Sequence, residues 1–136
     1  MSSAKQSSNE STFVKSKFYK EIEQQKRIIE SQFVLSLYKN TNYYFDYDIK
    51  VNEFSSPIWR FYYQMLKEMV EERKLRKMDV VTVSAYVQSK NDKLQQLFKK
   101  CGGYETIDKG MKIVEAENVD GYYSELQRYK TVLRLV

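Results

Sequence analysis

Residues 101–136 read CGGYETIDKGMKIVEAENVDGYYSELQRYKTVLRLV, and apolar side chains recur in this stretch every three or four residues. The recurring residues are Tyr104, Ile107, Met111 and Val114, followed by Val119, Tyr122, Leu126, Tyr129, Leu133 and Val136. This spacing keeps one apolar stripe on one face of a helix. Gly102 and Gly103 can end a preceding helix, and Asn118 or Asp120 can cap the second one. The stretch therefore predicts a C-terminal antiparallel helical hairpin over residues 102–136.

The second helix of this hairpin has more apolar surface than one neighbouring helix covers, because Tyr123, Val132 and Leu135 lie beside the main stripe. A helix whose last turn is apolar on two sides is typical of a contact with a partner. The predicted self-association residues are Tyr122, Leu126, Tyr129, Val132, Leu133 and Val136. The alternative is an ordinary bundle helix buried within the monomer, and the pattern leaves both interpretations open.

The rest of the chain predicts an all-α fold, with a polar tail at residues 1–20 and a helical head at residues 21–101. The tail has few apolar residues to offset the entropy of ordering, so we expect it to be flexible. In the head, Ser56 as a cap and Pro57 as the first helical residue predict the start of a central helix. Asp79 and Asn91 are the predicted caps of two later helices. The valine-rich segment Val80–Val87, which follows Asp79, also has the propensity of a strand. We expect a helix there, because the sequence predicts no second strand to pair with it. The predicted core residues are Phe33, Leu37, Trp59, Tyr62, Leu66, Met69, Leu97 and Phe98.

The composition fits one ordered domain, since 42% of the 136 residues are hydrophobic. With one cysteine and no histidine, a disulfide framework is excluded, and a zinc site or a histidine-dependent catalytic centre is not expected. Phosphate-binding, dinucleotide-binding and nucleophile-elbow motifs are absent from the sequence. We interpret Cys101 as a buried structural thiol. No catalytic, cofactor-binding or metal-binding residue is therefore predicted, and no cofactor is expected.

The formal charge of +5 raises the question of nucleic-acid binding. Much of the excess positive charge lies in residues 1–20, which contain four lysines and one glutamate. The rest of the domain therefore has nearly equal numbers of positive and negative charges. DNA binding by this domain is expected to be weak. The aromatic run from Tyr43 to Tyr47 could stack on single-stranded bases. We favour rings packed in the core instead, because Asp46 and Asp48 would repel phosphates.

No stretch approaches the about 20 apolar residues of a membrane span, and the polar N-terminus lacks the apolar core of a signal peptide. We therefore expect a soluble protein without membrane contact. Its lone cysteine is typical of a reducing compartment, which predicts a cytoplasmic location.

The order of these segments resembles the N-terminal domain of DnaB-type replicative DNA helicases, particularly those of phages. The resemblance covers about residues 21–136. Its parts are Glu23 and Gln24, the run from Phe54 to Arg60, the run from Asp79 to Val83, Gly102 to Tyr104, Asn118 to Tyr123, and Leu133 with Arg134. The resemblance implies a helical head followed by a hairpin that pairs between subunits, so that six domains form a collar on the helicase ring. It also implies a docking surface for primase or a helicase loader.

In that family an ATPase motor follows through a linker helix, and this sequence stops where the linker would begin. We therefore expect a non-catalytic domain for ring assembly and partner docking in DNA replication, acting as a dimer or a trimer of dimers, in the cytoplasm of a bacterial host if it is phage-encoded. One alternative is a stand-alone regulator that binds a host helicase or primase. Another is a helical protein that binds single-stranded nucleic acid through Tyr43–Tyr47.

Overall fold

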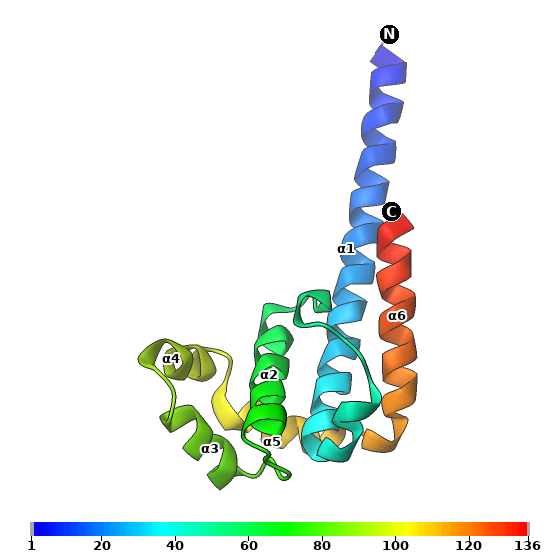
Figure 1. Ribbon diagram of the computed structural model, residues 1–136. Helices are drawn as coiled ribbons and strands as arrows, with labels where there is room; N and C mark the ends of the chain where they lie inside the picture. The colour runs from blue at the N-terminus through cyan, green and yellow to red at the C-terminus, as the bar shows by residue number, and fades with distance from the viewer. Residues whose placement is uncertain (1, 136) are drawn as a thin grey trace.

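The structure, a computed structural model, describes the backbone of residues 2–135 and the side chains of residues 15–135. The chain has an all-α fold, and its described part contains no strand (Figure 1). The α-helices are α1 (Ser2–Lys39), α2 (Pro57–Lys67), α3 (Val80–Gln88), α4 (Asp92–Lys100), α5 (Gly103–Ile113) and α6 (Val119–Leu135). Short 3-10 helices are η1 (Thr41–Asp46), η2 (Val51–Glu53) and η4 (Ala116–Asn118), and the π-helix η3 (Glu68–Glu72) prolongs α2.

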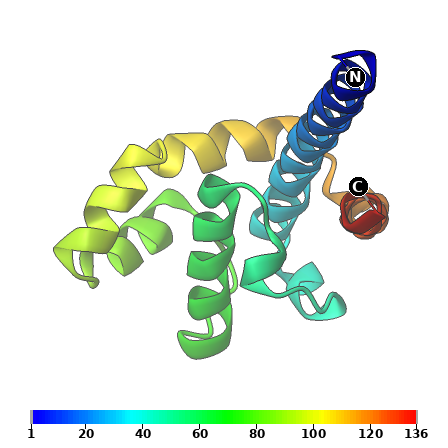
Figure 2. The ribbon, with the colours of Figure 1, turned by 90° about the horizontal axis from the view of Figure 1, so that it is seen from above.

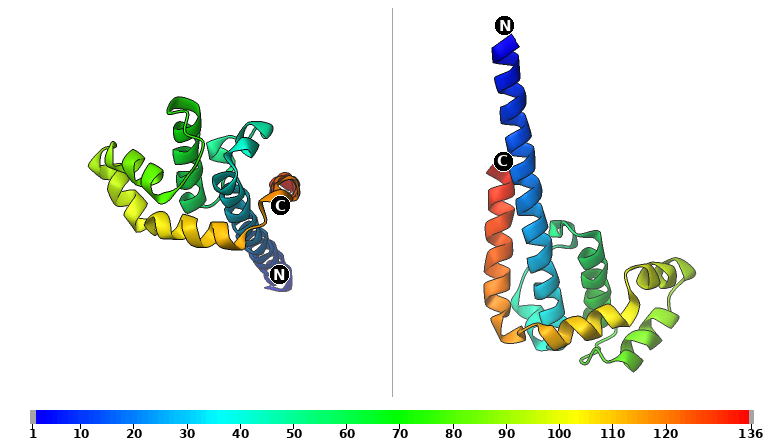
Figure 3. Two further views of the ribbon diagram at one scale, coloured as in Figure 1. Left: turned by 90° about the horizontal axis from the view of Figure 1, so that it is seen from below. Right: turned by 180° about the vertical axis from the view of Figure 1, so that it is seen from behind.

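The molecule is built along α1, which α6 accompanies in the opposite direction (Figures 1 and 3). The helix α2 packs on another side of α1, and α5 crosses α1 near its C-terminal end. Seen from above, α3 and α4 lie at the far side of α2 from the α1–α6 pair (Figure 2). The first turns of α1 extend beyond the end of α6 (Figure 3).

The core lies where α1, α2, α5 and α6 meet. Of the predicted core residues, Phe33, Leu37, Tyr62, Leu66 and Met69 are each at most 1% exposed, which confirms them. The hydroxyl of Tyr62 donates a hydrogen bond to the carbonyl of Gly103 at 2.9 Å, and that of Tyr38 donates to the Tyr62 carbonyl at 2.6 Å. These hydrogen bonds offset the cost of removing the two hydroxyls from water.

Three other core predictions turn out differently. Trp59 and Phe98 are half-buried and pack against the core from its edge. Leu97 is 41% exposed, so its assignment to the core is wrong. The reason is the position of α4 at the margin of the molecule, where it has no fully buried residue and contacts the core only through a narrow face that includes Leu94 and Phe98.

The side-chain caps predicted for the starts of α2, α3 and α4 are confirmed, while the cap expected from Asn118 or Asp120 at the start of α6 stays a prediction. Ser56 caps α2 by accepting a hydrogen bond from the Trp59 amide, Asp79 caps α3 through the Thr82 amide at 2.8 Å, and Asn91 caps α4 through the Leu94 amide at 3.0 Å. Gly102 and Gly103 have φ values of +107° and +63°, the left-handed region that favours glycine. The valine-rich segment is helical, as expected, and forms α3.

The boundary predicted at residue 20 is corrected, because α1 already begins at Ser2. Once the packed part of α1 has supplied the nucleus, each added residue gains a backbone hydrogen bond at little cost, so a polar segment can continue the helix. The flexibility of residues 1–20 stays a prediction. Residue 1 lies outside the described residues, as does Val136 at the other end.

The two helices expected from residues 102–136 are present as α5 and α6, with η4 in the turn between them. Their packing against each other as an antiparallel pair is not confirmed, since α6 lies along α1 while α5 crosses α1. The crossing is close at Gly110, where a Cβ atom would lie 2.4 Å from Cδ1 of Leu35. Only a glycine lets α5 approach α1 this closely without displacing Leu35.

Candidate functional site

The α1–α6 pair contains the residues for which the sequence predicts self-association. Two of them are buried within the monomer, since Leu126 is 2% and Tyr129 is 9% exposed. The Tyr129 hydroxyl donates a hydrogen bond to the side-chain oxygen of Gln25 on α1 at 3.2 Å. Leu126 and Tyr129 are therefore buried inside the monomer. This agrees, for these two residues, with the alternative that the apolar stripe belongs to an ordinary bundle helix.

The other predicted residues are less completely covered. Tyr122 is half-buried and packs against the core, and Val132 and Leu133 are half-buried near the end of α6. Val136 lies outside the described residues. Leu135, which the sequence placed beside the stripe, is 83% exposed. The one large apolar residue of α6 that is well exposed thus lies in its last turn.

The same region of α1 also exposes large apolar side chains. The helices α1 and α6 are antiparallel, and Tyr129 on α6 contacts Gln25 on α1. Six residues further along α6 is Leu135, and six residues back along α1 is Tyr19. Leu135 and Tyr19 therefore lie at the same height along the two helices. Tyr19 is 39% exposed and its neighbour Phe18 is 46% exposed. We call this level of the two helices the open end of the helix pair, and it comprises Phe18, Tyr19, Val132, Leu133 and Leu135. The sequence did not single out its α1 half, because Phe18 and Tyr19 fell within the predicted polar tail.

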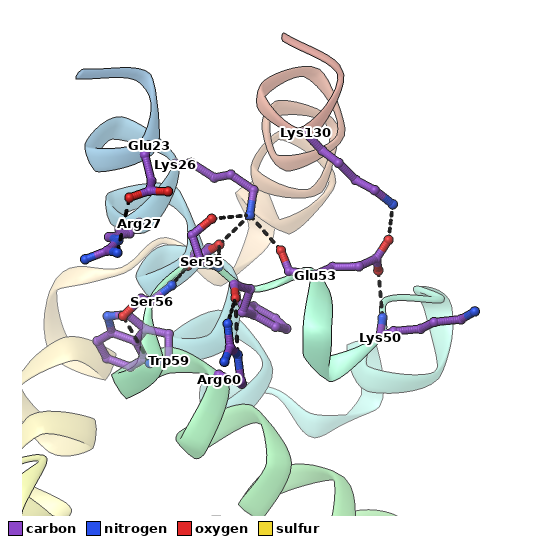
Figure 4. Close-up of polar contacts among 12 residues, drawn as sticks. Glu23, Lys26, Arg27, Lys50, Glu53, Ser55, Ser56, Trp59, Arg60 and Lys130 are labelled. Carbon is purple, nitrogen blue, oxygen red and sulfur yellow. Dashed lines mark hydrogen bonds and ion pairs between the residues drawn. The ribbon is translucent and has the colours of Figure 1, made fainter. Parts of the chain in front are cut away.

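A buried polar cluster holds the helix pair to the start of α2 (Figure 4). The Glu30 carboxylate is fully buried and accepts hydrogen bonds from the backbone amides of Ser55 at 2.7 Å and Ser56 at 2.9 Å. Lys26, one turn away, donates to Glu30 at 2.7 Å, to the carbonyl of Glu53 at 2.7 Å and to the Ser55 hydroxyl at 3.1 Å. Each proton of the buried ammonium therefore has an acceptor, as a buried charge requires.

The cluster continues to α6 through Glu53. One carboxylate oxygen of Glu53 accepts the Lys50 amide at 2.7 Å, and the other accepts a proton from Lys130 on α6 (Figure 4). Partial burial opposes ionisation of Glu53, but the hydrogen bonds from Lys130 and from the Lys50 amide outweigh it and lower the pKa of its carboxyl group. The pairing of Glu53 with Lys130 joins residues far apart in the sequence, so no local pattern could have predicted it.

The aromatic run that could have stacked on nucleic-acid bases is largely part of the core. Tyr44 is 6% exposed, and Tyr43 and Tyr47 are half-buried against the core. The Tyr47 ring packs edge-on against Phe33, and its hydroxyl donates to Asp120 on α6. Only Phe45 of the run is well exposed, at 67%. The interpretation of these rings as core residues is confirmed for all but Phe45.

Among residues 15–135 no cluster of three or more histidine, cysteine, aspartate or glutamate side chains is arranged to hold a metal ion. Cys101 is half-buried with a free thiol, and burial raises its pKa. No helix in the described part of the chain has the length and apolar content needed to cross a membrane. Comparison with protein-family models, with curated proteins and with solved structures gives no match for this chain.

Proposed function

We propose that this chain is a non-catalytic assembly and docking domain of a DnaB-type replicative helicase, acting in DNA replication in a bacterial cytoplasm. The sequence resemblance supports this proposal, and so does the all-α fold. The observation that carries it is the open end of the helix pair, where Leu135 is 83% exposed level with the exposed rings of Phe18 and Tyr19. In this proposal the open end joins two copies of the chain, and the head binds primase or a helicase loader.

A two-fold contact suits this surface, because each copy supplies the same patch and covers that of its partner. Burying one exposed leucine side chain is worth about 1.5–3 kcal/mol, and a symmetric contact buries it twice. The core does not change in such an assembly, since Leu126 and Tyr129 are already covered by α1. Association through the open end therefore needs no rearrangement of the monomer.

Sedimentation velocity of the wild type and of Leu135→Asp, each at two concentrations, tests the assembly. The wild type is expected to sediment faster at the higher concentration, and Leu135→Asp to stay monomeric with unchanged thermal unfolding. The control is Val81→Asp, which also replaces an apolar residue by a charged one. Val81 is 74% exposed on α3, so this variant should associate as the wild type does. A wild type that stays monomeric at both concentrations contradicts the assembly proposal.

Co-sedimentation with a purified DnaB-type helicase and with its primase tests the docking half of the proposal. We expect the chain to move with primase and the Leu135→Asp variant to keep that interaction, since its head is unaltered. Association with neither protein contradicts the docking role. Association with the helicase ring alone would instead favour a regulator that binds the ring.

A further inference from the structure

The head carries a pocket on the side of η1 and η3. It has a volume of about 370 Å³ and is lined by Thr41, Asn42, Phe45, Val70, Glu71, Lys74, Leu75 and Arg76. We call it the basic pocket. Its apolar wall consists of Phe45, Val70 and Leu75, and the size falls within the range of about 300–1,000 Å³ that is typical of ligand sites.

The wall formed by residues 74–76 is held in place by specific hydrogen bonds. The Thr41 hydroxyl donates to the Arg76 carbonyl at 2.5 Å, and the Leu75 amide donates to the Met69 carbonyl at 2.9 Å. Lys74 has a φ of +58°, a left-handed conformation that costs energy for any residue with a Cβ atom. It directly follows the π-turn that ends in the Arg73 cap, and such turns are frequent at functional sites. A lysine therefore occupies a lining position where glycine would be less strained.

The cations of this pocket are free to meet a ligand. Lys74 and Arg76 are exposed, and neither forms an ion pair with another residue of the described part of the chain. The neighbouring Arg73 is already engaged, since it donates to the Ser89 hydroxyl at 3.1 Å and lies over the Tyr86 ring. The two free cations next to an apolar wall are complementary to a ligand that combines carboxylates with an apolar side chain.

We propose that the basic pocket docks an acidic peptide segment of a partner protein, with an apolar side chain against Phe45 and Leu75 and carboxylates against Lys74 and Arg76. Single-stranded nucleic acid fits less well, because it carries a negative charge at every nucleotide and cannot keep all of them away from Glu71. A peptide can place its apolar side chain on that side of the pocket and its carboxylates only against Lys74 and Arg76. This inference rests on the proposed function for the existence of a docking partner, and it names the chemistry of that partner.

Fluorescence anisotropy with a labelled peptide tests the site. The probe has a central leucine and phenylalanine flanked on each side by two acidic residues. Saturable binding to the full chain is expected, with Arg76→Gln and Phe45→Ala each weakening it about fivefold or more. Lys93→Gln removes an exposed cation from α4, outside the pocket, and should leave the affinity unchanged. Absence of saturable binding, or equal affinities for all variants, overturns the proposal.

Lys74→Gly separates binding from structure. Glycine relieves the left-handed strain, so this variant should melt at a temperature equal to or above that of the wild type. It lacks the cation, so its peptide affinity should fall about threefold or more. A loss of affinity without a loss of stability is not expected of a residue with a merely structural role. Unchanged affinity in Lys74→Gly contradicts the role given to this side chain.

Two further arms complete the test. An unlabelled single-stranded oligothymidylate should fail to displace the peptide; displacement that depends on Arg76 would assign the pocket to nucleic acid and overturn the peptide proposal. The peptide should bind Leu135→Asp as tightly as the wild type. Failure of self-association with intact peptide binding, or the reverse, would therefore show which of the two proposals is wrong.

Discussion

Glu30 is a fully buried carboxylate on which two backbone amides and one buried ammonium depend. We predict that Glu30→Ala lowers the free energy of unfolding by about 3–5 kcal/mol, because it leaves Lys26 charged and without its partner in the interior. Equilibrium urea denaturation measures this loss. The matched control is Glu23→Ala, which removes an ion pair of the same i, i+4 spacing with Arg27 at the surface.

The Glu23→Ala variant should lose no more than about 1 kcal/mol, since surface ion pairs contribute little. Equal losses for Glu23→Ala and Glu30→Ala would contradict the importance given to burial. We further expect Lys26→Met to recover part of the stability when it is added to Glu30→Ala, because it removes the unpaired charge. The amides of Ser55 and Ser56 would still lack their acceptor, so the recovery should be incomplete.

Tyr62 makes the stability of the protein fall as the pH becomes alkaline. Burial raises the pKa of its hydroxyl from 10.0 to about 12, because the interior disfavours the tyrosinate. In the unfolded chain the group ionises near pH 10, so its contribution to stability is complete below pH 10 and is lost as the pH rises towards 12. Each such tyrosine adds a slope of about 1.4 kcal/mol per pH unit in that window.

Tyr62→Phe is therefore expected to reduce the fall in stability between pH 10 and 12, as measured by urea denaturation at each pH. Its stability at neutral pH should drop, since the hydrogen bond to the Gly103 carbonyl is lost. Tyr63→Phe should flatten the same window, because burial also raises the pKa of Tyr63 to about 12. An unchanged pH slope in both variants would show that these hydroxyls ionise freely in the folded protein.

At the scale of elements, the crossing of α5 over α1 depends on the absence of a side chain at Gly110. We predict that Gly110→Ala lowers the free energy of unfolding by about 1–3 kcal/mol, because the new Cβ would lie 2.4 Å from Leu35. Gly121→Ala is the control on α6, where no atom lies within 4 Å of the added Cβ. It should raise stability by up to about 1 kcal/mol through helix propensity. Thermal denaturation of the two variants should therefore shift in opposite directions.

At the scale of the whole molecule, the positive charge is unevenly distributed. Lys15, Lys17 and Lys20 are exposed on α1 near the open end of the helix pair. We predict that the chain binds single-stranded DNA weakly and that replacing these three lysines by glutamine reduces the salt dependence of binding. The control replaces Lys93, Lys99 and Lys100, three exposed cations on α4, by glutamine. If the control variant loses more affinity in a salt titration than the first, the interface lies on α4 instead.

The sequence by itself determined the fold class and the starts of α2, α3 and α4, because these depend on short-range physics. The hydroxyl, carboxylate and carboxamide caps at Ser56, Asp79 and Asn91 and the positive φ of Gly102 act within one helical turn, so neighbouring residues suffice to predict them. The apolar periodicity also identified most of the core. It failed at Leu97, where the spacing was helical but the helix lies at the margin of the molecule.

The tertiary structure alone decided which helices are neighbours and which apolar residues remain uncovered. A helical stripe shows that α6 needs a neighbour, but the same stripe fits α5, α1 or a second copy, and only the packing assigns Leu126 and Tyr129 to α1. The open end, the Glu53–Lys130 pair and the basic pocket likewise bring together residues distant in the sequence. Long-range contacts of this kind follow from how complete faces fit together, so no local pattern determines them.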